Sequence, residues 1–448
     1  MTDLRLECDL LVLGSGMAGL SAAAWAAERG ARVAVVEKAA AIGGSAALSG
    51  GMLWTATSPR RMRLHGGGQE ALGQVVLENY PVALQWLRAR DIAISDAMSS
   101  LHGRGYQVDI IAHLRGCAAI VEQAGGQIAL ETSTEALLTD DHGRVVGART
   151  SHRDGDIDIV APWTLLATGG YQGSPEMRAA YIHPNALQMR LRSNLTSCGD
   201  GLRLAMAVGA AAPAANPGFY GHLVSETPDW GDPRLFTLLS QYHSDHTLLL
   251  NEEGVRFCDE SAGDHANSYH TLIQTNARAL CFWDTRIHAQ QATQPIVAAA
   301  PPIDRMEVAL RYGGKGAVAA SLADVASFAA AQGFDGARVR QSIEDYNRRS
   351  RDAWETLSPE RAENSGPLEA PPYYALIVHP AITHTHGGLR IDPQARVLKA
   401  DGAPVGGLLA AGGDAGDVFG LGYAGGLAMG IAFGIEAART AGFRRELA

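Results

Sequence analysis

The feature that most constrains the fold is a glycine-rich turn between two short apolar runs near the N-terminus. Residues 9–13 lead directly into Gly14-Ser15-Gly16-Met17-Ala18-Gly19. An alanine-rich stretch over 20–29 and a second apolar run over 32–36 follow, and Glu37 stands at the end of that run. Continuous apolar runs are typical of buried parallel strands. The pattern therefore predicts a strand–helix–strand unit.

Each glycine of the turn has a separate physical task in such a unit. Gly14 permits the tight turn, Gly16 lets the backbone approach a pyrophosphate, and Gly19 allows the helix to pack closely on the strand. The helix N-terminus offers free N–H groups and the positive end of its dipole to phosphates. Glu37 can accept hydrogen bonds from a ribose diol. The sequence therefore predicts a dinucleotide-binding fold.

Two glycine pairs soon after the acidic residue favour FAD over a nicotinamide cofactor. Glu37-Lys38 is followed by Gly43-Gly44-Ser45 and then by Ser49-Gly50-Gly51. Such loops suit a chain that follows an extended cofactor toward a flavin ring, whereas a nicotinamide domain would proceed to further strand–helix units. No second complete fingerprint is present in the sequence, and residues 313–316 are interpreted as a loop.

Composition and charge exclude several other classes of protein. The net charge of −10 argues against a broad nucleic-acid surface. The five cysteines are scattered, and His243 and His246 have no third ligand nearby, so no metal site is expected. A core strand begins almost at once, and no apolar run reaches the roughly 18–20 residues of a membrane span. We therefore expect a cytoplasmic protein with no signal peptide, no membrane span and no nucleic-acid partner.

Beyond the first unit, the apolar pattern alternates between helical and strand periods. Residues 60–125 are expected to be mostly helical. Strands are expected near 127–130 and 144–148, with a hairpin turn at 140–143 between them. A long amphipathic helix is expected over 337–351.

A change of composition divides the chain into domains. From 217 to 366, proline, tryptophan, histidine and polar residues become more frequent and the glycine pairs fade. We interpret 1–216 as the first part of an FAD-binding domain, 217–366 as a capping or substrate domain, and 367–448 as the second FAD-binding part. The predicted fold is α/β, a Rossmann-type FAD-binding domain with an inserted α+β capping domain.

Further motifs follow the fingerprint in a fixed order. They are Thr168-Gly169-Gly170, Gly199-Asp200-Gly201 and the segments 254–260, 385–389, 411–414 and 423–426. Together with the N-terminal motifs, they resemble the flavoprotein subunit family of fumarate reductase and succinate dehydrogenase, which includes 3-ketosteroid dehydrogenases. The resemblance covers nearly the whole chain.

The resemblance implies an FAD domain with a cap, and a substrate held between cap and flavin. It places Asp414 near the flavin-proximal part of FAD and Leu427 beneath the isoalloxazine ring, where a helix dipole would favour the anionic reduced flavin. Covalent members have a histidine where this chain has Gly44, so non-covalent FAD is expected. The residues expected to bind the cofactor are Gly14, Gly16, Ala18, Gly19, Glu37, Lys38, Gly43, Gly44, Ser45, Ser49, Gly50, Gly51, Thr168, Gly169, Gly170, Asp200, Gly413, Asp414, Gly425, Gly426 and Leu427.

Two departures from the fumarate reductases bear on the activity. In those enzymes an arginine that acts as the acid stands where this chain has Gly263-Asp264-His265. A second arginine, which binds the substrate, stands where this chain has Tyr423. An arginine can clamp a dicarboxylate with two hydrogen bonds, which a tyrosine cannot do. A tyrosine there resembles the ketosteroid dehydrogenases, in which it polarises or positions a carbonyl.

The candidate catalytic residues follow from this comparison. Tyr423 is the candidate carbonyl donor, with a packing role beside the flavin as the alternative. His384 matches a substrate-binding histidine of the family, whereas the neighbours of His386 suggest a flavin contact. Asp264 or His265 is the candidate general base. Other titratable cap residues either line the pocket or are structural; they are Tyr220, His222, Tyr242 and His243.

The predicted activity is an FAD-dependent dehydrogenation of a CH–CH bond next to a carbonyl. A base removes the α-proton, a hydride passes to the flavin, and hydrogen-bond donors stabilise the enolate. The substrate is expected to be a small hydrophobic ketone, such as a 3-ketosteroid-like cyclic ketone. A flavin enoate reductase is the first alternative, and a non-catalytic electron-transfer subunit is the second. The sequence identifies no electron partner.

Overall fold

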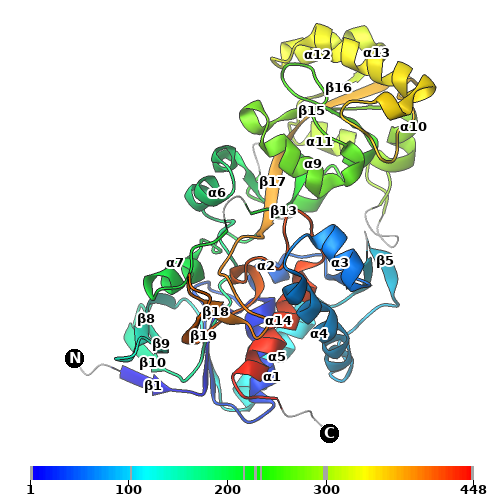
Figure 1. Ribbon diagram of the computed structural model, residues 1–448. Helices are drawn as coiled ribbons and strands as arrows, with labels where there is room; N and C mark the ends of the chain where they lie inside the picture. The colour runs from blue at the N-terminus through cyan, green and yellow to red at the C-terminus, as the bar shows by residue number, and fades with distance from the viewer. Residues whose placement is uncertain are drawn as a thin grey trace. The chain divides into compact units, whose positions relative to one another are not determined.

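The computed structural model describes residues 4–100, 103–214, 217–226, 230–232, 235–295 and 301–444. The chain divides into two compact units, whose elements are labelled in Figure 1. Unit 1 comprises Met1–Ile182, Ser193–Phe219 and His384–Ala448, and unit 2 comprises His183–Arg192 and Tyr220–Thr383.

The predicted strand–helix–strand unit is confirmed at the start of unit 1. Strands β2 (Leu10–Leu13) and β3 (Val33–Val36) are parallel and fully buried, and helix α1 (Met17–Ala27) connects them. Apolar residues at every position suit strands that are covered on both faces. The predicted α/β, Rossmann-type fold class is therefore correct.

The central sheet of unit 1 brings together strands from distant parts of the chain. Its order is β18 (Arg396–Leu398), β19 (Pro404–Ala410), β11 (Thr164–Leu166), β2, β3 and β7 (Gln127–Ala129). All neighbours are parallel except β18, which runs antiparallel to β19. Strand β2, which leads into the glycine turn, thus lies between β3 and β11.

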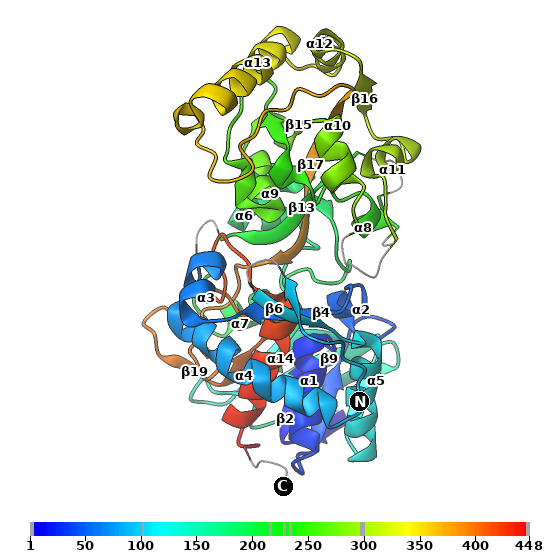
Figure 2. The ribbon, with the colours of Figure 1, turned by 90° about the vertical axis from the view of Figure 1, so that its right-hand side faces the viewer.

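Helix α1 is buried along its whole length because other helices cover it. Helix α14 (Gly426–Thr440) packs along it, as Figures 1 and 2 show, and α5 (Ile110–Gln123) packs on it as well. The α1–α14 contact is close. A Cβ on Gly434 would meet the carbonyl oxygen of Ala18 at 2.5 Å. This packing explains why α1 is rich in alanine and has no polar face.

Two smaller sheets complete unit 1. One has the order β1 (Leu4–Glu7), β10 (Gly155–Val160), β9 (Val145–His152) and β8 (Ser133–Thr139). The predicted hairpin turn at 140–143 is confirmed, as are strands near 127–130 and 144–148; the turn joins β9 to β8, a strand that the sequence did not indicate. The other sheet has the order β4 (Met52–Ala56), β6 (Gly103–Gln107) and β5 (Met98–Ser100).

Strands β5 and β6 interrupt the region that the sequence predicts as mostly helical. The prediction missed them because β6 contains Gly103 and Gly105, which give no strand signal. Both glycines are needed for packing, since a Cβ on Gly103 would meet the carbonyl oxygen of Thr55 at 2.0 Å. The helices of unit 1, besides α1, α5 and α14, are α2 (Gly44–Ala47), α3 (Pro59–Gly66), α4 (Glu70–Arg88), α6 (Pro175–Tyr181) and α7 (Asp200–Ala207).

Unit 2 is built around the long strand β17 (Tyr373–Thr385), whose last two residues belong to unit 1. Its sheet has the order β12 (Arg190–Leu191), β17, β15 (Ala279–Asp284) and β14 (Leu248–Leu250); β13 (Phe219–Ser225) and β16 (Gly316–Ala319) also pair with β17. Phe282 and Trp283 lie in its core. Its helices, seen from the side in Figure 2, are α8 (Leu235–Leu238), α9 (Asp264–Leu272), α10 (Thr285–Ile287), α11 (Arg305–Arg311), α12 (Leu322–Ala331) and α13 (Gly336–Asp352).

The sheet of unit 2 explains where its boundaries fall. The sequence-based interpretation placed the insert at 217–366, whereas unit 2 comprises Tyr220–Thr383 and His183–Arg192. Its additional C-terminal part contains the residues of β17 that pair with β15 and β16, and the segment His183–Arg192 contains β12, which pairs with β17. Among the residues that the structure describes, no helix has the length and apolar character that a membrane crossing requires.

Candidate active site

The glycine turn after β2 combines tight packing with one open position. A Cβ on Gly14 would meet the carbonyl oxygen of Ala167 at 2.2 Å, and a Cβ on Gly19 would meet that of Gly14 at 2.0 Å. A Cβ on Gly16, in contrast, would have the carbonyl oxygen of Gly43 at 3.9 Å as its nearest neighbour. The protein therefore leaves space at Gly16 that a bound group can use.

The N-terminus of α1 at this turn has no side-chain cap. Gly16 is the N-cap residue, and the first turn contains no acidic side chain. The first N–H groups of a helix have no partner within the helix, and they carry its positive partial charge. An uncapped helix N-terminus beside an open glycine fits a pyrophosphate.

Glu37 follows β3 and is held in place by its hydrogen bonds. Only 8% of the residue is exposed. Its Oε2 accepts hydrogen bonds from the N–H and the hydroxyl of Ser15 at 2.9 and 2.7 Å, and its Oε1 accepts one from the N–H of Ala39 at 2.8 Å. The carboxylate retains lone pairs that can accept from a ribose diol. Sequence reasoning did not assign a role to Ser15, although its place inside the fingerprint was a signal.

Lys38 and Asp200, both expected to bind the cofactor, form an ion pair with each other. Asp200 is the first residue of α7 and also pairs with Arg203. The structure thus brings together two segments that lie far apart in the sequence, the end of β3 and the start of α7.

The second glycine loop is anchored by side chains that the sequence did not indicate. Ser45, in α2, shares hydrogen bonds through its hydroxyl with Ser193 and with Nδ2 of Asn194. Nδ2 of Asn194 is also the nearest protein atom, at 3.5 Å, to a Cβ on Gly44. Gly43 donates its N–H to the carbonyl oxygen of Ser15 at 3.0 Å, so this loop is joined to the first glycine turn.

The loop at 49–51 is bonded to its own neighbours. The hydroxyl of Ser49 donates to the carbonyl oxygen of Ala46 at 2.7 Å. The carbonyl oxygen of Gly51 accepts from the N–H of Val108 at 2.9 Å, and that of Gly50 accepts from Gln107. These contacts fix the path of the loop.

Asp414 connects two distant segments of unit 1, because it forms hydrogen bonds to a loop 246 positions earlier in the chain. Its carboxylate accepts from the N–H and the hydroxyl of Thr168 and from the N–H of Gly170. Burial raises the pKa of Asp414, and these hydrogen bonds oppose the shift. The glycines beside it are closely packed: a Cβ on Gly413 would lie 2.5 Å from the carbonyl carbon of Gly169.

The glycine pair Gly425-Gly426 lies at the N-terminus of α14. Gly425 is its N-cap residue and has a left-handed φ of 97°. Gly426 and Leu427 begin the helix, and the N–H of Gly426 donates to the hydroxyl oxygen of Tyr423 at 2.7 Å. Leu427 is half-buried. The tyrosine therefore satisfies one N–H group of this helix terminus.

Tyr423 lies among aromatic rings. Trp54 and Phe419 contact it edge-on, with ring centroids at 5.7 and 5.4 Å, and His386 lies parallel to it at 6.0 Å. Burial raises the pKa of Tyr423 to about 12, although the hydrogen bond from Gly426 lowers it. The phenol is therefore protonated at neutral pH.

The two candidate histidines have different surroundings. Desolvation lowers the pKa of His384 to about 4, so the imidazole is neutral at pH 7. Its buried Nδ1 has no hydrogen-bond partner among the described residues. His386 shares a hydrogen bond between its Nδ1 and the carbonyl oxygen of Gly420 at 2.7 Å. Their ring centroids are 5.8 Å apart.

The candidate general base Asp264 is engaged within unit 2. As the first residue of α9, it forms a short hydrogen bond with Nδ1 of His222, and its Oδ1 also accepts from the N–H of Leu223 at 3.2 Å. Nε2 of His222 lies 2.9 Å from the hydroxyl of Tyr220. His265 follows Asp264 in α9 and is half-buried.

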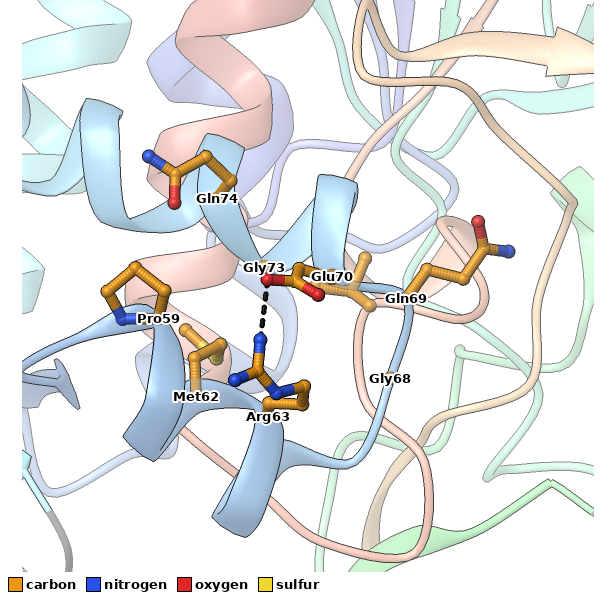
Figure 3. A pocket seen from close by; sticks show the side chains of 9 residues that line it. Pro59, Met62, Arg63, Gly68, Gln69, Glu70, Gly73 and Gln74 are labelled. Atoms are coloured by element: carbon orange, nitrogen blue, oxygen red, sulfur yellow. Dashed lines mark hydrogen bonds and ion pairs between the residues drawn. The ribbon is translucent and has the colours of Figure 1, made fainter.

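A small hollow on unit 1 lies apart from these residues. Figure 3 shows it between α3 and α4, with Arg63 pointing toward Glu70, its ion-pair partner at 2.5 Å. Its lining residues are Pro59, Met62, Arg63, Gly68, Gln69, Glu70, Gly73, Gln74 and Val418. None of the predicted site residues is among them, so this hollow is not part of the predicted cofactor site.

The strand order, the open glycine turn and the uncapped helix together define a dinucleotide-binding protein of the Rossmann type. A model of the FAD binding domain family matches residues 9–427. The chain belongs to this family, and FAD is its cofactor.

Similar proteins include both reductases and dehydrogenases. A probable fumarate reductase of Shewanella frigidimarina is 27% identical over 94% of this chain and 72% of its own. The 4-oxocyclohexanecarboxylate 2-dehydrogenase of Sinomonas cyclohexanicum is 26% identical over 94% of this chain and 90% of its own. The 3-ketosteroid Δ4-(5α)-dehydrogenase of Rhodococcus jostii, solved in complex with 4-androstene-3,17-dione, shares the fold with a TM-score of 0.76, 21% identity and coverage of 98% of both chains. The chain is an FAD-dependent oxidoreductase of the class that acts on CH–CH groups.

Proposed function

We propose that this enzyme removes two hydrogens from neighbouring carbons next to the carbonyl of a cyclic ketone. The observation that carries the proposal is the hydrogen bond from the N–H of Gly426 to the hydroxyl oxygen of Tyr423. A tyrosine hydroxyl that accepts a hydrogen bond can also donate one, and a substrate carbonyl oxygen is a suitable acceptor. Accepting a hydrogen bond also polarises the O–H bond and strengthens it as a donor.

The surroundings of Tyr423 support a ketone rather than a dicarboxylate. The rings of Trp54 and Phe419 offer apolar contact. His384 is neutral at pH 7, because desolvation lowers its pKa to about 4. A buried carboxylate needs a cationic partner, whereas a ketone needs only a hydrogen-bond donor. Neutral donors among aromatic rings therefore suit an apolar ring with one carbonyl group.

The residues of the chain then have distinct tasks. Gly16 and the N-terminus of α1 would hold the pyrophosphate of FAD, and Glu37 its ribose. FAD supplies the two-electron acceptor when it is bound. Tyr423 donates a hydrogen bond to the carbonyl oxygen and stabilises the enolate that forms when the α-proton leaves. Nδ1 of His384, which has no hydrogen-bond partner among the residues that the structure describes, would orient the substrate.

The reverse reaction is the second candidate, because the relatives include a probable fumarate reductase. The same hydrogen bond from Tyr423 would then polarise the carbonyl of an unsaturated ketone for hydride addition. The flavin potential and the electron partner decide the direction.

An anaerobic titration of the purified flavoprotein distinguishes the two directions. We expect a saturated 3-ketosteroid or an uncharged cyclohexanone to bleach the flavin absorbance, on the order of one equivalent of ketone per flavin. If neither compound bleaches the flavin and an unsaturated ketone or fumarate reoxidises the chemically reduced enzyme, the protein is a reductase and the dehydrogenase proposal is wrong.

A further inference from the structure

The side chain of Asn194 connects two of the glycine loops that are expected to bind the cofactor. Its Nδ2 donates to the hydroxyl oxygen of Ser45, in the second glycine loop, at 2.9 Å and to that of Ser197 at 3.0 Å. Ser197 packs on the loop that contains Gly169, since a Cβ on Gly169 would lie 2.6 Å from the hydroxyl oxygen of Ser197. All of these residues belong to unit 1. Asn194 therefore links segments that lie 149 positions apart in the chain.

Backbone donors fix the orientation of the Asn194 amide. Its Oδ1 accepts from the N–H groups of Thr196 and Ser197 at 2.7 and 3.0 Å, and from the hydroxyl of Thr196 at 2.7 Å. A backbone N–H group can only donate, so the side-chain atom that it meets must be the amide oxygen. Nδ2 is then the donor in both of its contacts, and the hydroxyl oxygen of Ser45 is an acceptor.

Burial decides the direction of the hydrogen bond between the hydroxyls of Ser45 and Ser193. Ser193 is 4% exposed, and its hydroxyl has no other partner among the residues that the structure describes. Because an unsatisfied buried donor is costly, the hydroxyl proton of Ser193 points to Ser45. The oxygen of Ser45 then accepts two hydrogen bonds, which use both of its lone pairs. The hydroxyl of Ser45, which is half-buried, can therefore only donate to a further group.

The loop that carries this hydroxyl borders the open position at Gly16. A Cβ on Gly44 would lie 3.8 Å from Cα of Gly16, and Gly43 donates its N–H to the carbonyl oxygen of Ser15 at 3.0 Å. The two hydrogen bonds that the Ser45 oxygen accepts polarise its O–H bond and strengthen it as a donor. A phosphate oxygen carries negative charge and accepts hydrogen bonds, so it is the acceptor that matches such a donor.

We propose that Asn194 and Ser193 are positioning residues of the FAD site and that they direct the hydroxyl of Ser45 to a pyrophosphate oxygen of the bound cofactor. Neither Asn194 nor Ser193 has to touch FAD, because each acts through Ser45. The inference concerns only the binding of the cofactor. It therefore holds for either direction of the reaction and for any substrate.

The test is a titration of the apoprotein with FAD and with ADP, which has a pyrophosphate but no flavin. Ser45→Ala is expected to raise the Kd of both ligands about 10- to 100-fold, the usual range for a lost hydrogen bond to a charged group. Asn194→Ala should raise both about tenfold, because Ser45 then loses one of the two bonds that direct its proton. Ser45→Thr keeps the hydroxyl and should restore binding to within about threefold of wild type. Thr196→Val is the matched control, because it removes a hydroxyl from the same turn and leaves Nδ2 of Asn194 in place.

A double-mutant cycle shows whether Asn194 acts through Ser45. In the Ser45→Ala background, Asn194→Ala should change the Kd of FAD by less than about twofold, because no hydroxyl is left to direct. If Asn194 served only to hold its own turn, the two effects would be independent and the two losses in affinity would multiply. That result, or an ADP affinity that neither single variant changes, would overturn the proposal.

A second variant keeps the proposal testable if Asn194→Ala does not fold. Asn194→Asp retains the oxygen that holds the turn but has no N–H group to donate, so the hydroxyl of Ser45 should turn toward the new carboxylate. ³¹P NMR of the bound FAD should then show a displaced pyrophosphate signal in Ser45→Ala and in Asn194→Asp, and the wild-type signal in Thr196→Val. A wild-type signal in Ser45→Ala would show that this hydroxyl does not bind the pyrophosphate, and the proposal would be wrong.

Discussion

A Cβ atom on Gly16 would lie 3.9 Å from its nearest protein neighbour, the carbonyl oxygen of Gly43. The folded protein therefore has room for a methyl group at this position, and the backbone of Gly16, with φ of −77°, is accessible to alanine. A bound pyrophosphate would occupy that room. We predict that Gly16→Ala folds normally but loses FAD affinity at least about tenfold, the equivalent of about 1.4 kcal/mol. Flavin content after gel filtration, with circular dichroism of the same sample, checks this.

The control for that prediction is Gly116→Ala. Gly116 lies in α5, and a Cβ there also has no neighbour within 4 Å. The same methyl group should leave flavin content unchanged and slightly stabilise the helix. Equal flavin content in Gly16→Ala and wild type would show that no ligand lies against Gly16.

Glu37→Gln should weaken FAD binding without unfolding the protein. The amide keeps one acceptor oxygen for the N–H of Ser15, but it loses the charge and one acceptor site for the ribose. Hydrogen bonds to charged groups contribute about 1.5–3 kcal/mol, so we expect the Kd to rise about 10- to 100-fold. Titration of the apoprotein with FAD measures the Kd. Glu28→Gln, which changes an acid that binds Trp86 instead, should bind FAD like wild type.

Tyr423→Phe should slow flavin reduction by the ketone about 100-fold, the usual scale of a lost oxyanion donor. The variant should retain its flavin and its affinity for a saturated steroid analogue. Tyr171→Phe is the control, because Tyr171 is a buried tyrosine of unit 1 whose hydroxyl has no partner among the described residues. An unchanged rate in Tyr423→Phe would assign Tyr423 to packing alone.

His384 should make the protein less stable in mild acid. Its pKa is about 4 in the folded chain and near 6.5 when unfolded, so the unfolded state binds more protons between these values. Stability is therefore full above pH 6.5 and falls as the pH drops toward 4, by up to about 3 kcal/mol for this residue. His384→Gln should lose less stability than wild type over this window in urea unfolding. Equal losses would contradict the desolvation of His384.

The sequence predicted those parts of the fold whose signals are local. The βαβ unit and α13 lie where the apolar pattern places them, because each pattern is contained in a few consecutive residues. Strand β6 was missed because Gly103 and Gly105 are required by its partner β4, which lies far away in sequence. The limits of unit 2 depend on which strands pair with β17, and pairing between distant strands leaves no mark in composition.

For the candidate site too, the sequence predicted local motifs but not contacts between distant segments. The sequence indicated Glu37 and the glycines, since their spacing belongs to one motif. It could not indicate that Asp414 binds Thr168, or that Asp264 meets His222, because these partners lie 246 and 42 positions apart. Tyr220 and His222 were noted only as titratable residues of the cap. Their connection to Asp264 depends on how β13 and α9 pack.

The burial of α1 sets the order of events during synthesis. The fingerprint leaves the ribosome well before α14 does, and segments made earlier generally fold first. Here, however, α14 covers α1, and β2 pairs with β11. The nucleotide-binding site at the glycine turn is therefore incomplete until Thr440, the last residue of α14, has been synthesised. Until α14 has been synthesised, the apolar, alanine-rich helix α1 lacks the partner that covers it. The site for the flavin is therefore completed only after α14 has packed against α1.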